Sequence, residues 1–593
     1  MGRVLILATA LAASTNQGCP SPPEPCPRGT VAFMGACRDG CPPSELTADR
    51  ECGCPEGTQG LETDAGTVCL EPDELPGSDM GPADAASDSG EACTPGQECR
   101  PTACMVGVTE CPGGALVCAD QQAVSDGTTC DSCGAAVCRC HEGFCESQLS
   151  RVAGRLKRFP ADPSDVLGFG SLVALRADGR HVAVVASDRV QLLERGADGL
   201  QEAPALLLPS VLASGARAIA MSGDGNVLAL GFPFDGSSAS GVLESLPEFD
   251  GAVPGAGGVL IYRRSGAGSF QVDAYVKAPA PSEGDALGFA LALDEDGTNL
   301  IVGAPGRAFG GVPRSGEVLV YRREAAGGWR FEAALGAAQP QSGSRLGEAV
   351  AVTASGALVA AGSPGDPTSS GGVSPAPDAL SPFSGAIHVF SSAEGTWSPG
   401  VLLKAPRPDT GDRVGASVAI SPDGSRLVAG APGEDSSSAE LDDDLLGDSG
   451  AVFAFEFSLG AWSYDLKVKA PDPDEGDEFG RSVTLASDGA LLFVGVGEED
   501  GGSSDFGGDP ARNDNNQSGA VFGFRRSAEG FVRVLYLKAP LPGTDFLFGE
   551  QVVSSRDGRV LVVGSPGEAL GGAGLDPGDV TLENSAGAVY VYE

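Results

Sequence analysis

The chain has 593 residues, with 38 Lys and Arg against 80 Asp and Glu, so its formal net charge is −42. This balance argues strongly against binding to nucleic acid or to an anionic membrane surface, because both need a basic face that displaces counterions. Gly (88) and Pro (43) are abundant, aromatic residues make up 6%, and apolar residues come in short β-branched runs. The composition predicts a turn-rich all-β protein with more than one domain.

Residues 1–18 predict an export signal. Arg3 is followed by the apolar stretch 4–13, which is too short for a bilayer span of roughly 20 residues. No other segment approaches that length. We therefore expect an exported protein without a transmembrane helix.

Gly18-Cys19 resembles the end of a bacterial lipobox, in which Cys19 would be acylated after cleavage, although Asn16 stands where Leu is usual. An ordinary signal-peptidase site at Ala10-Leu11-Ala12 is the alternative. With Cys19 set aside, six Cys remain up to residue 70 and ten from residue 93 on, and both numbers are even, as closed disulfide modules require. One unpaired thiol is the other interpretation of the odd total.

All 17 Cys lie between Cys19 and Cys145, which predicts two small disulfide-rich modules, 19–70 and 93–150. Zinc is disfavoured because no second CxxC accompanies Cys130-x-x-Cys133 at zinc-ribbon spacing. The segment 71–92 between the modules is acidic and rich in Pro, Gly and Ser, as in a flexible linker.

Residues 151–593 contain seven copies of one unit with two glycine landmarks that lie 15 residues apart. The first landmark follows an apolar residue at Gly170, Gly288, Gly347, Gly415, Gly480 and Gly549. The second belongs to a GAP-like motif at Gly231, Gly303, Gly362, Gly430, Gly495 and Gly564. Unit two has Ala216 at the first position and unit one has Val185 at the second. A constant core with connections of variable length indicates a repeated supersecondary unit.

Each unit contains signals for four strands. The two landmarks lie on strands joined by an Asp-Gly turn such as Asp423-Gly424, a third strand follows as in 587–593, and a fourth precedes the motif Lys-Ala-Pro. Seven four-stranded units in a ring predict a seven-bladed β-propeller. The chain ends on a third strand, so residues 151–160 are expected to supply the missing fourth strand of the last blade.

The units resemble FG-GAP repeats, the blades of the propeller in integrin α chains and in many bacterial surface proteins. Phe169-Gly170, Phe479-Gly480 and Phe548-Gly549 match the FG element, and GAP stands at 303–305 and 430–432. The resemblance covers 151–593. It implies a surface-binding or adhesion protein that uses the loop-rich face of the propeller.

The resemblance also raises the question of calcium, because integrin blades often carry a DxDxDGxxD loop. Here most of these loops are reduced to a bare turn, and the segment 294–299 alone keeps several oxygen ligands, in Asp294, Asp296 and Asn299. This loop is shorter than the family loop. A plain Asp-Gly turn is the alternative.

Acidic residues are densest in two loop types that are expected to emerge on one face, the inserts between second and third strands and the loops between blades. The candidate binding face consists of Asp442, Asp443, Asp444, Asp474, Glu475, Asp477, Glu498, Glu499 and Asp500. These carboxylates would bind a divalent cation or a cationic partner. A solvated surface without a ligand is the alternative.

Signals for catalysis are weak. The chain has three His and no nucleophile elbow, HExxH or P-loop motif, and the Lys of Lys-Ala-Pro recurs in four units, which favours a structural role. We therefore predict a non-catalytic binding or adhesion protein, held at the cell surface by a lipid or secreted if Cys19 is not lipidated. Its expected partner is an extracellular protein or glycan. The alternative is an extracellular propeller hydrolase or lyase, or a subunit of one.

Overall fold

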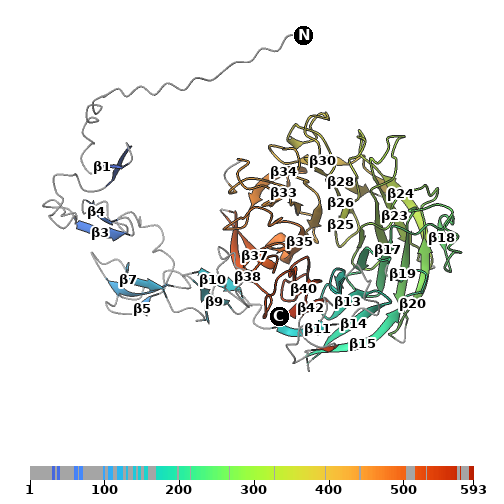
Figure 1. Cartoon of the computed structure of the whole chain (residues 1–593), viewed down its shortest axis with the longest axis horizontal. Coiled ribbons are helices and arrows are strands. Elements are labelled where there is room, and N and C mark those ends of the chain that lie inside the picture. The colour runs from blue at the N-terminus through green and yellow to red at the C-terminus, as the bar shows by residue number, and fades with distance from the viewer. Residues whose placement is uncertain are drawn as a thin grey trace, which may run out of the picture. The chain divides into compact units, whose positions relative to one another are not determined.

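The computed structural model describes, with side chains, residues 168–569 and 587–593, apart from 197–198, 214, 266–267, 326, 394, 440–442, 502–514 and 529. Elsewhere it describes only the backbone of strands. The described chain from residue 152 on forms a closed ring of seven antiparallel sheets (Figure 1). The predicted all-β, seven-bladed propeller is confirmed.

The first four blades follow one another in chain order. Blade one contains β12 (Val173–Leu175), β13 (His181–Ala186), β14 (Arg189–Gly196) and β15 (Gly199–Leu207). Blade two contains β16 (Ala218–Met221), β17 (Val227–Phe232), β19 (Gly258–Arg264), β20 (Phe270–Val276) and the short β18 (Val242–Leu243). Blade three contains β21 (Leu291–Leu293), β22 (Asn299–Ala304), β23 (Glu317–Arg323) and β24 (Trp329–Leu335). Blade four contains β25 (Ala349–Val352), β26 (Leu358–Ser363), β28 (Ala386–Ala393), β30 (Val401–Lys404) and the short β27 (Gly372–Val373) and β29 (Thr396–Trp397).

The remaining blades complete the ring. Blade five contains β31 (Ser417–Ile420), β32 (Arg426–Ala431), β33 (Ala451–Ser458) and β34 (Ala461–Val468). Blade six contains β35 (Ser482–Ala486), β36 (Leu491–Val496), β37 (Ala520–Ser527) and β38 (Gly530–Leu537). Blade seven contains β39 (Gln551–Ser554), β40 (Leu561–Ser565), β42 (Ala588–Tyr592), β11 (Val152–Lys157) and the short β41 (Gly574–Leu575).

The ring closes through strand β11, as the sequence predicts. β11 lies beside β42 in blade seven, with Leu156 paired to Val589 in an antiparallel register. The first strand of each blade contacts the first strand of the next, including β39 with β12. The strands nearest to the N-terminus and the C-terminus of the propeller therefore share one sheet, which joins the two ends of the ring.

Upstream of the propeller, the backbone forms hairpins and small sheets. Their strands are β1 (Thr30–Phe33), β2 (Ala36–Asp39), β3 (Gln59–Thr63), β4 (Gly66–Leu70), β5 (Glu98–Cys99), β6 (Met105–Glu110), β7 (Val117–Ala123), β8 (Thr129–Cys130), β9 (Cys138–His141) and β10 (Phe144–Ser147). The predicted signal, the lipidation at Cys19 and the disulfides lie outside the described residues. Among the residues that are described, no helix is long and apolar enough to cross a membrane.

The hydrophobic core consists of seven clusters, and each cluster is shared by two neighbouring blades. The second strands are buried along most of their length, and β17 and β22 are buried throughout. They face another blade on each side, so both of their faces must be apolar. This explains why the second strands are continuous apolar runs in the sequence and do not alternate between apolar and polar residues.

The two glycine landmarks meet at the junctions between blades. A Cβ atom added to Gly430 of blade five would lie 1.8 Å from the carbonyl oxygen of Gly480 in blade six. The corresponding distance is 1.9 to 2.0 Å at the junctions made by Gly231, Gly303, Gly362, Gly495 and Gly564. No side chain fits at these contacts, so glycine is required for close approach of the two backbones.

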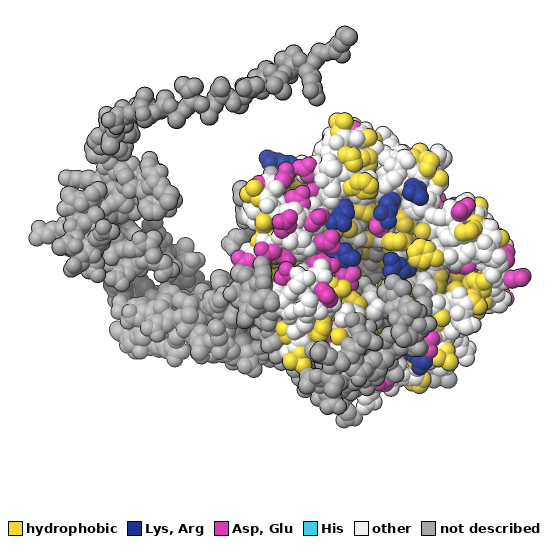
Figure 2. Space-filling model, in the orientation of Figure 1, with side chains coloured by type: hydrophobic (Ala, Val, Ile, Leu, Met, Phe, Trp, Pro, Cys, Tyr) yellow, Lys and Arg dark blue, Asp and Glu magenta, His cyan; other side chains and the backbone are white. Residues whose placement is uncertain are grey.

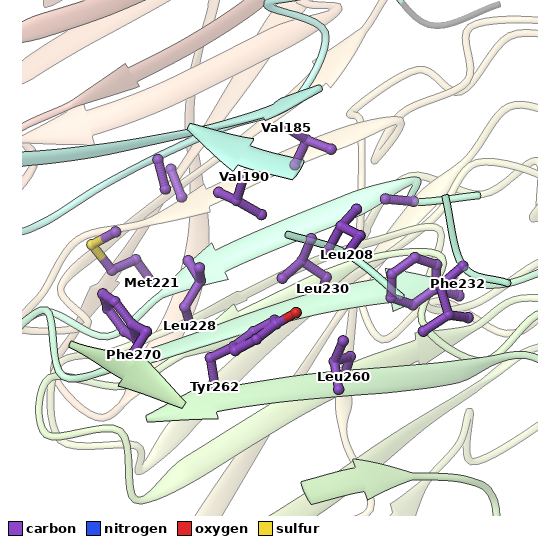
Figure 3. Packing of buried hydrophobic residues seen from close by; sticks show 14 of the residues in the cluster. Val185, Val190, Leu208, Met221, Leu228, Leu230, Phe232, Leu260, Tyr262 and Phe270 are labelled. Atoms are coloured by element: carbon purple, nitrogen blue, oxygen red, sulfur yellow. The ribbon is translucent and has the colours of Figure 1, made fainter. Parts of the chain in front are cut away.

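The seventh junction, between blades one and two, is the one where the sequence departs from the pattern. Val185 and Ala216, which replace the two glycines, both belong to the cluster that joins these blades. Figure 3 shows this cluster, in which Val185 lies near Val190, and Leu208, Leu230 and Phe232 fill the adjoining space. Val185 and Ala216 belong to different units, yet both lie at the interface between blades one and two. There, apolar packing takes the place of the glycine contact found at the other junctions.

The Asp-Gly turns between first and second strands gather at the end of the second strands that lies opposite the inserts. Backbone hydrogen bonds link turns of neighbouring blades, from Ala177 N–H to the Gly223 carbonyl (3.2 Å) and from Arg556 N–H to the Ala177 carbonyl (2.8 Å). An ion pair between Arg556 and Glu295 joins blade seven to blade three. These contacts hold the turn end of the ring together.

Candidate functional site

An acidic cavity of about 290 Å³ opens at blade five, where the two acidic loop types meet. The loop that enters the blade supplies Asp409 and Asp412, and the insert between β32 and β33 supplies Asp443 and Asp444. The charged lining residues are Arg407, Asp409, Asp412, Glu434, Asp435, Asp443, Asp444 and Lys467. On the face shown in Figure 2, Asp and Glu side chains gather over blades five and six, on the left, and Lys and Arg side chains lie nearer the centre of the ring.

Glu434 forms the floor of the insert. It lies three residues after the end of β32 and is 7% exposed. Its carboxylate accepts hydrogen bonds from Lys467 (3.1 Å), Lys469 (2.9 Å) and the Ser436 hydroxyl (2.6 Å). Burial would raise the pKa of Glu434, but the charge of Lys469 and the hydrogen bond from Ser436 outweigh it and lower the pKa. Glu434 is therefore a fixed anion beneath the cavity.

The same arrangement recurs around the ring. In each blade that carries Lys-Ala-Pro, the Lys is buried and pairs with an acid located four residues after the second glycine landmark. The pairs are Lys277–Asp235, Lys404–Asp366, Lys469–Glu434 and Lys538–Glu499. Each pair ties the base of an insert to the fourth strand of its own blade. The structural role predicted for the lysines agrees with these contacts.

Blade three lacks the Lys and has replaced the acid as well. Arg307 stands where the other blades have an acid, and it forms ion pairs with Asp285 (2.5 Å) and with Glu317. Gly336 stands at the Lys position, and a Cβ atom there would lie 2.2 Å from the ring of Phe309. The positive charge thus stands at the acid position and pairs with the preceding loop and with the third strand, and an aromatic ring fills the space of the lysine stem.

Two aspartates below the acidic loops are buried, and among the described residues neither forms an ion pair with a cation. Asp412 is 3% exposed and Asp477 is 4% exposed, and their carboxylates accept the N–H groups of Asp409 (2.8 Å) and Asp474 (3.1 Å). Burial, reinforced by Glu434, Asp409 and Asp435, raises the pKa of Asp412 to about 8. Burial, reinforced by Glu499, raises the pKa of Asp477 to about 7. Asp412 therefore holds its proton at neutral pH, whereas Asp477 titrates within the neutral range.

In blade five, two residues of the predicted binding face line the cavity, and one of them also holds the insert in place. Asp443 accepts hydrogen bonds from the Ser437 N–H (2.7 Å) and hydroxyl (2.8 Å), so it orders the insert as well as lining the cavity. Asp444 lines the cavity. Asp442 lies outside the described residues.

In blade six, the structure separates residues that the sequence placed together. Glu475 is exposed, but Glu499 is buried and is held by Lys538 and the Tyr536 hydroxyl. Asp500 accepts the Gln517 N–H (2.7 Å). The surface acidity of this blade is thus smaller than the sequence suggests, because Asp477 and Glu499 lie beneath the loops.

The candidate calcium residues form a hairpin turn. The carboxylate of Asp294 accepts the backbone N–H (3.0 Å) and side-chain amide (2.6 Å) of Asn299, one on each oxygen. Asp296 accepts the Thr298 N–H (3.0 Å). The carboxylates of Asp294 and Asp296 thus accept hydrogen bonds from within the turn itself. This arrangement does not fit a calcium loop of the integrin type. Within the described residues, no group of three or more His, Cys, Asp or Glu is placed to hold a metal ion.

The two histidines of the propeller are strand residues. His388 is 5% exposed, and burial lowers its pKa to about 4, so it is neutral at pH 7. Burial, followed by the charge of Arg264, lowers the pKa of His181.

An ion-pair network that sequence reasoning missed links blades five, six and seven. Arg413 contacts Asp448 (2.9 Å) and Glu478 (3.3 Å), and Arg481 contacts Glu478 (2.5 Å) and Glu550 (3.1 Å). Arg413 (φ 58°) and Glu478 (φ 54°) both adopt left-handed backbone conformations two residues before a landmark glycine. The sequence showed that Arg413 and Glu478 hold the same position in the repeat, two residues before a landmark glycine. It did not show which residues they pair with.

Comparisons with known proteins give a likeness of fold only. No protein-family model matches the chain, and no curated protein matches its sequence. Among solved structures, the chain is similar to Kuenenia stuttgartiensis hydrazine synthase, with a TM-score of 0.39 and 12% identity over 67% of this chain and 93% of that one. A similarity at this level carries no conclusion about function.

The raised pKa of Asp412 predicts how stability changes with pH. The folded state holds this proton up to about pH 8, whereas an unfolded Asp releases it near pH 4. The folded state therefore binds more protons between these values, and its free energy of unfolding falls as pH rises through this window. From pH 5 to pH 8 we expect a loss on the order of 2–4 kcal/mol from this group. Asp412→Asn should remove that loss, whereas Asp444→Asn, at an exposed neighbour, should keep it. Urea unfolding at both pH values measures the effect, and equal pH dependence in wild type and Asp412→Asn would contradict it.

Proposed function

We propose that this chain is an exported surface protein of the FG-GAP type that binds an extracellular partner through the blade-five cavity, without catalysis. The observation that carries the proposal is the convergence of carboxylates from two loops on one cavity, above the buried Asp412. Side chains of one sign repel one another there, and a bound cationic group would relieve that repulsion.

The size of the cavity restricts the ligand. At about 290 Å³ it lies at the lower end of the range for ligand pockets, so it accommodates one side chain or a hydrated ion. A Lys or Arg of a protein partner supplies the matching charge, whereas a neutral glycan does not. Binding of a cation would also displace the proton of Asp412, because a nearby positive charge lowers the pKa of a carboxyl group.

Removing the charges at the rim tests the proposal. The variant Asp442→Asn/Asp443→Asn/Asp444→Asn keeps the acceptor oxygen for Ser437 and should fold normally. We expect it to bind a lysine-rich peptide at least tenfold more weakly than wild type, as measured by calorimetry. The control Glu244→Gln/Glu248→Gln/Glu283→Gln removes three charges from exposed loops of blade two and from the loop that follows it, and should stay within twofold of wild type.

Two outcomes would contradict this assignment. Equal affinity in the rim variant and the control would show that the peptide responds to the overall charge alone. Stoichiometric uptake of Ca²⁺ that is lost in the rim variant, without peptide binding in wild type, would replace the partner side chain with a metal ion.

We further propose that the protein is anchored to the cell surface by a lipid on Cys19. The lipobox-like Gly18-Cys19 and the even number of remaining cysteines support this proposal. Mass spectrometry of the mature N-terminus should find Cys19 as the first residue, carrying acyl chains. An unmodified N-terminus upstream of Cys19 would contradict the anchor.

A further inference from the structure

A basic groove lies at the other end of the blade sheets from the acidic inserts. Its volume is about 810 Å³, and its charged lining residues are Arg263, Arg322, Arg323, Glu324 and Arg330. β19 and β23 run from the inserts toward this groove and end at Arg264 and Arg323. The groove therefore belongs to blades two and three and is independent of the cavity in blade five.

The arginines of this groove are exposed, while two of the carboxylates that pair with them are much less so. The side chains of Arg263, Arg322 and Arg330 are 48%, 45% and 47% exposed. Asp273, which pairs with Arg263, is 13% exposed, and Glu332, which pairs with Arg322 and Arg330, is 8% exposed. Among the lining residues, Glu324 is the one exposed acid, at 55%, and it pairs with Arg330 (3.2 Å). The solvent-exposed surface of the groove is thus mainly positive, although the net charge of the chain is −42.

Contacts beneath the surface hold these side chains in place. Arg263 donates to Asp273 (2.9 Å), whose second oxygen accepts the Nε1–H of the buried Trp329 (3.0 Å). Arg323 donates to the carbonyl oxygen of Asp296 (3.1 Å). Guanidinium groups fixed in this way lose little conformational entropy when an anion binds to their remaining N–H groups.

The placement of Arg322 and Arg330 has a cost for folding. The two residues are directly opposite each other on β23 and β24. Like charges in that relation destabilise an antiparallel pair. Glu332, which both arginines share, and Glu324, which pairs with Arg330, offset part of the repulsion, and a bound anion would offset more of it.

We infer that this groove binds an acidic polysaccharide through its carboxylate or sulfate groups. The guanidinium groups come from two blades and line one groove, which suits a chain with repeated anionic groups. The lining is Arg263, Thr298, Arg322, Arg323, Glu324, Ala325, Gly327 and Arg330, with no aromatic ring for stacking a nucleobase. At physiological ionic strength the screening length is about 8 Å, so the acidic loops at the other end of the sheets do not prevent binding.

Removing the opposed arginines from the full chain tests this inference. We expect wild type to bind heparin at physiological salt, with an affinity that falls as salt increases, and Arg322→Gln/Arg330→Gln to bind at least tenfold more weakly. The control Arg525→Gln/Arg533→Gln removes the same charge from blade six and should bind like wild type. Circular dichroism and thermal unfolding confirm that both variants are folded.

Several results would overturn the inference. Absence of heparin binding by wild type, or equal losses in the groove and control variants, would show that the groove is not the site. Equal affinity for single-stranded DNA would indicate a general response to polyanions. Full competition by inorganic sulfate at equal charge concentration would indicate a site for single anions. None of these results bears on the blade-five cavity, which is tested with a cationic probe.

Discussion

The propeller depends on a contact between two backbones that leaves no room for a side chain. At six junctions the glycine of a second strand lies against the carbonyl oxygen of the landmark glycine in the next blade. Within a blade, the N–H of the landmark glycine donates to the carbonyl oxygen of the second-strand glycine, as from Gly415 to Gly430 (2.9 Å). The contacts alternate around the ring, so the distance and angle between blades are repeated wherever both glycines are present.

The buried ion pairs serve a different purpose from the glycine contacts. In four blades they fix the base of the insert to the fourth strand, so the insert can vary in length and sequence while its ends stay in place. Blade three fixes its insert differently, because Arg307 stands at the acid position and pairs with Asp285 and Glu317. Rigid loop ends of this kind allow the carboxylates of blade five to surround one cavity.

The sequence predicted the number of blades and the closing strand because both follow from periodicity. It also showed where the pattern fails, at Val185 and Ala216, but not that these positions meet, because each lies in a different unit. The acid four residues after the second glycine was visible in the sequence, yet its burial was not. Glu499 therefore counted as a surface residue until the structure placed it against Lys538.

The site was harder to predict, because the solvent exposure of a loop carboxylate depends on which side chains fold over it. Asp477 and Asp412 resemble their exposed neighbours in sequence and differ from them only in depth. The arginine groove was missed for a related reason. Its residues are scattered along three strands and two turns, and the net charge of the chain directed attention to the acidic loops.

The most direct test of the junction is the stability of Gly430→Ala compared with Gly196→Ala. At Gly196 an added Cβ meets nothing within 4 Å, so that substitution should change the free energy of unfolding by no more than about 0.5 kcal/mol. At Gly430 the added atom must displace the backbone of blade six, and we expect a loss of at least about 3 kcal/mol or failure to fold. Equal stability of the two variants in urea unfolding would contradict the claim that these glycine contacts determine how the blades pack in the ring.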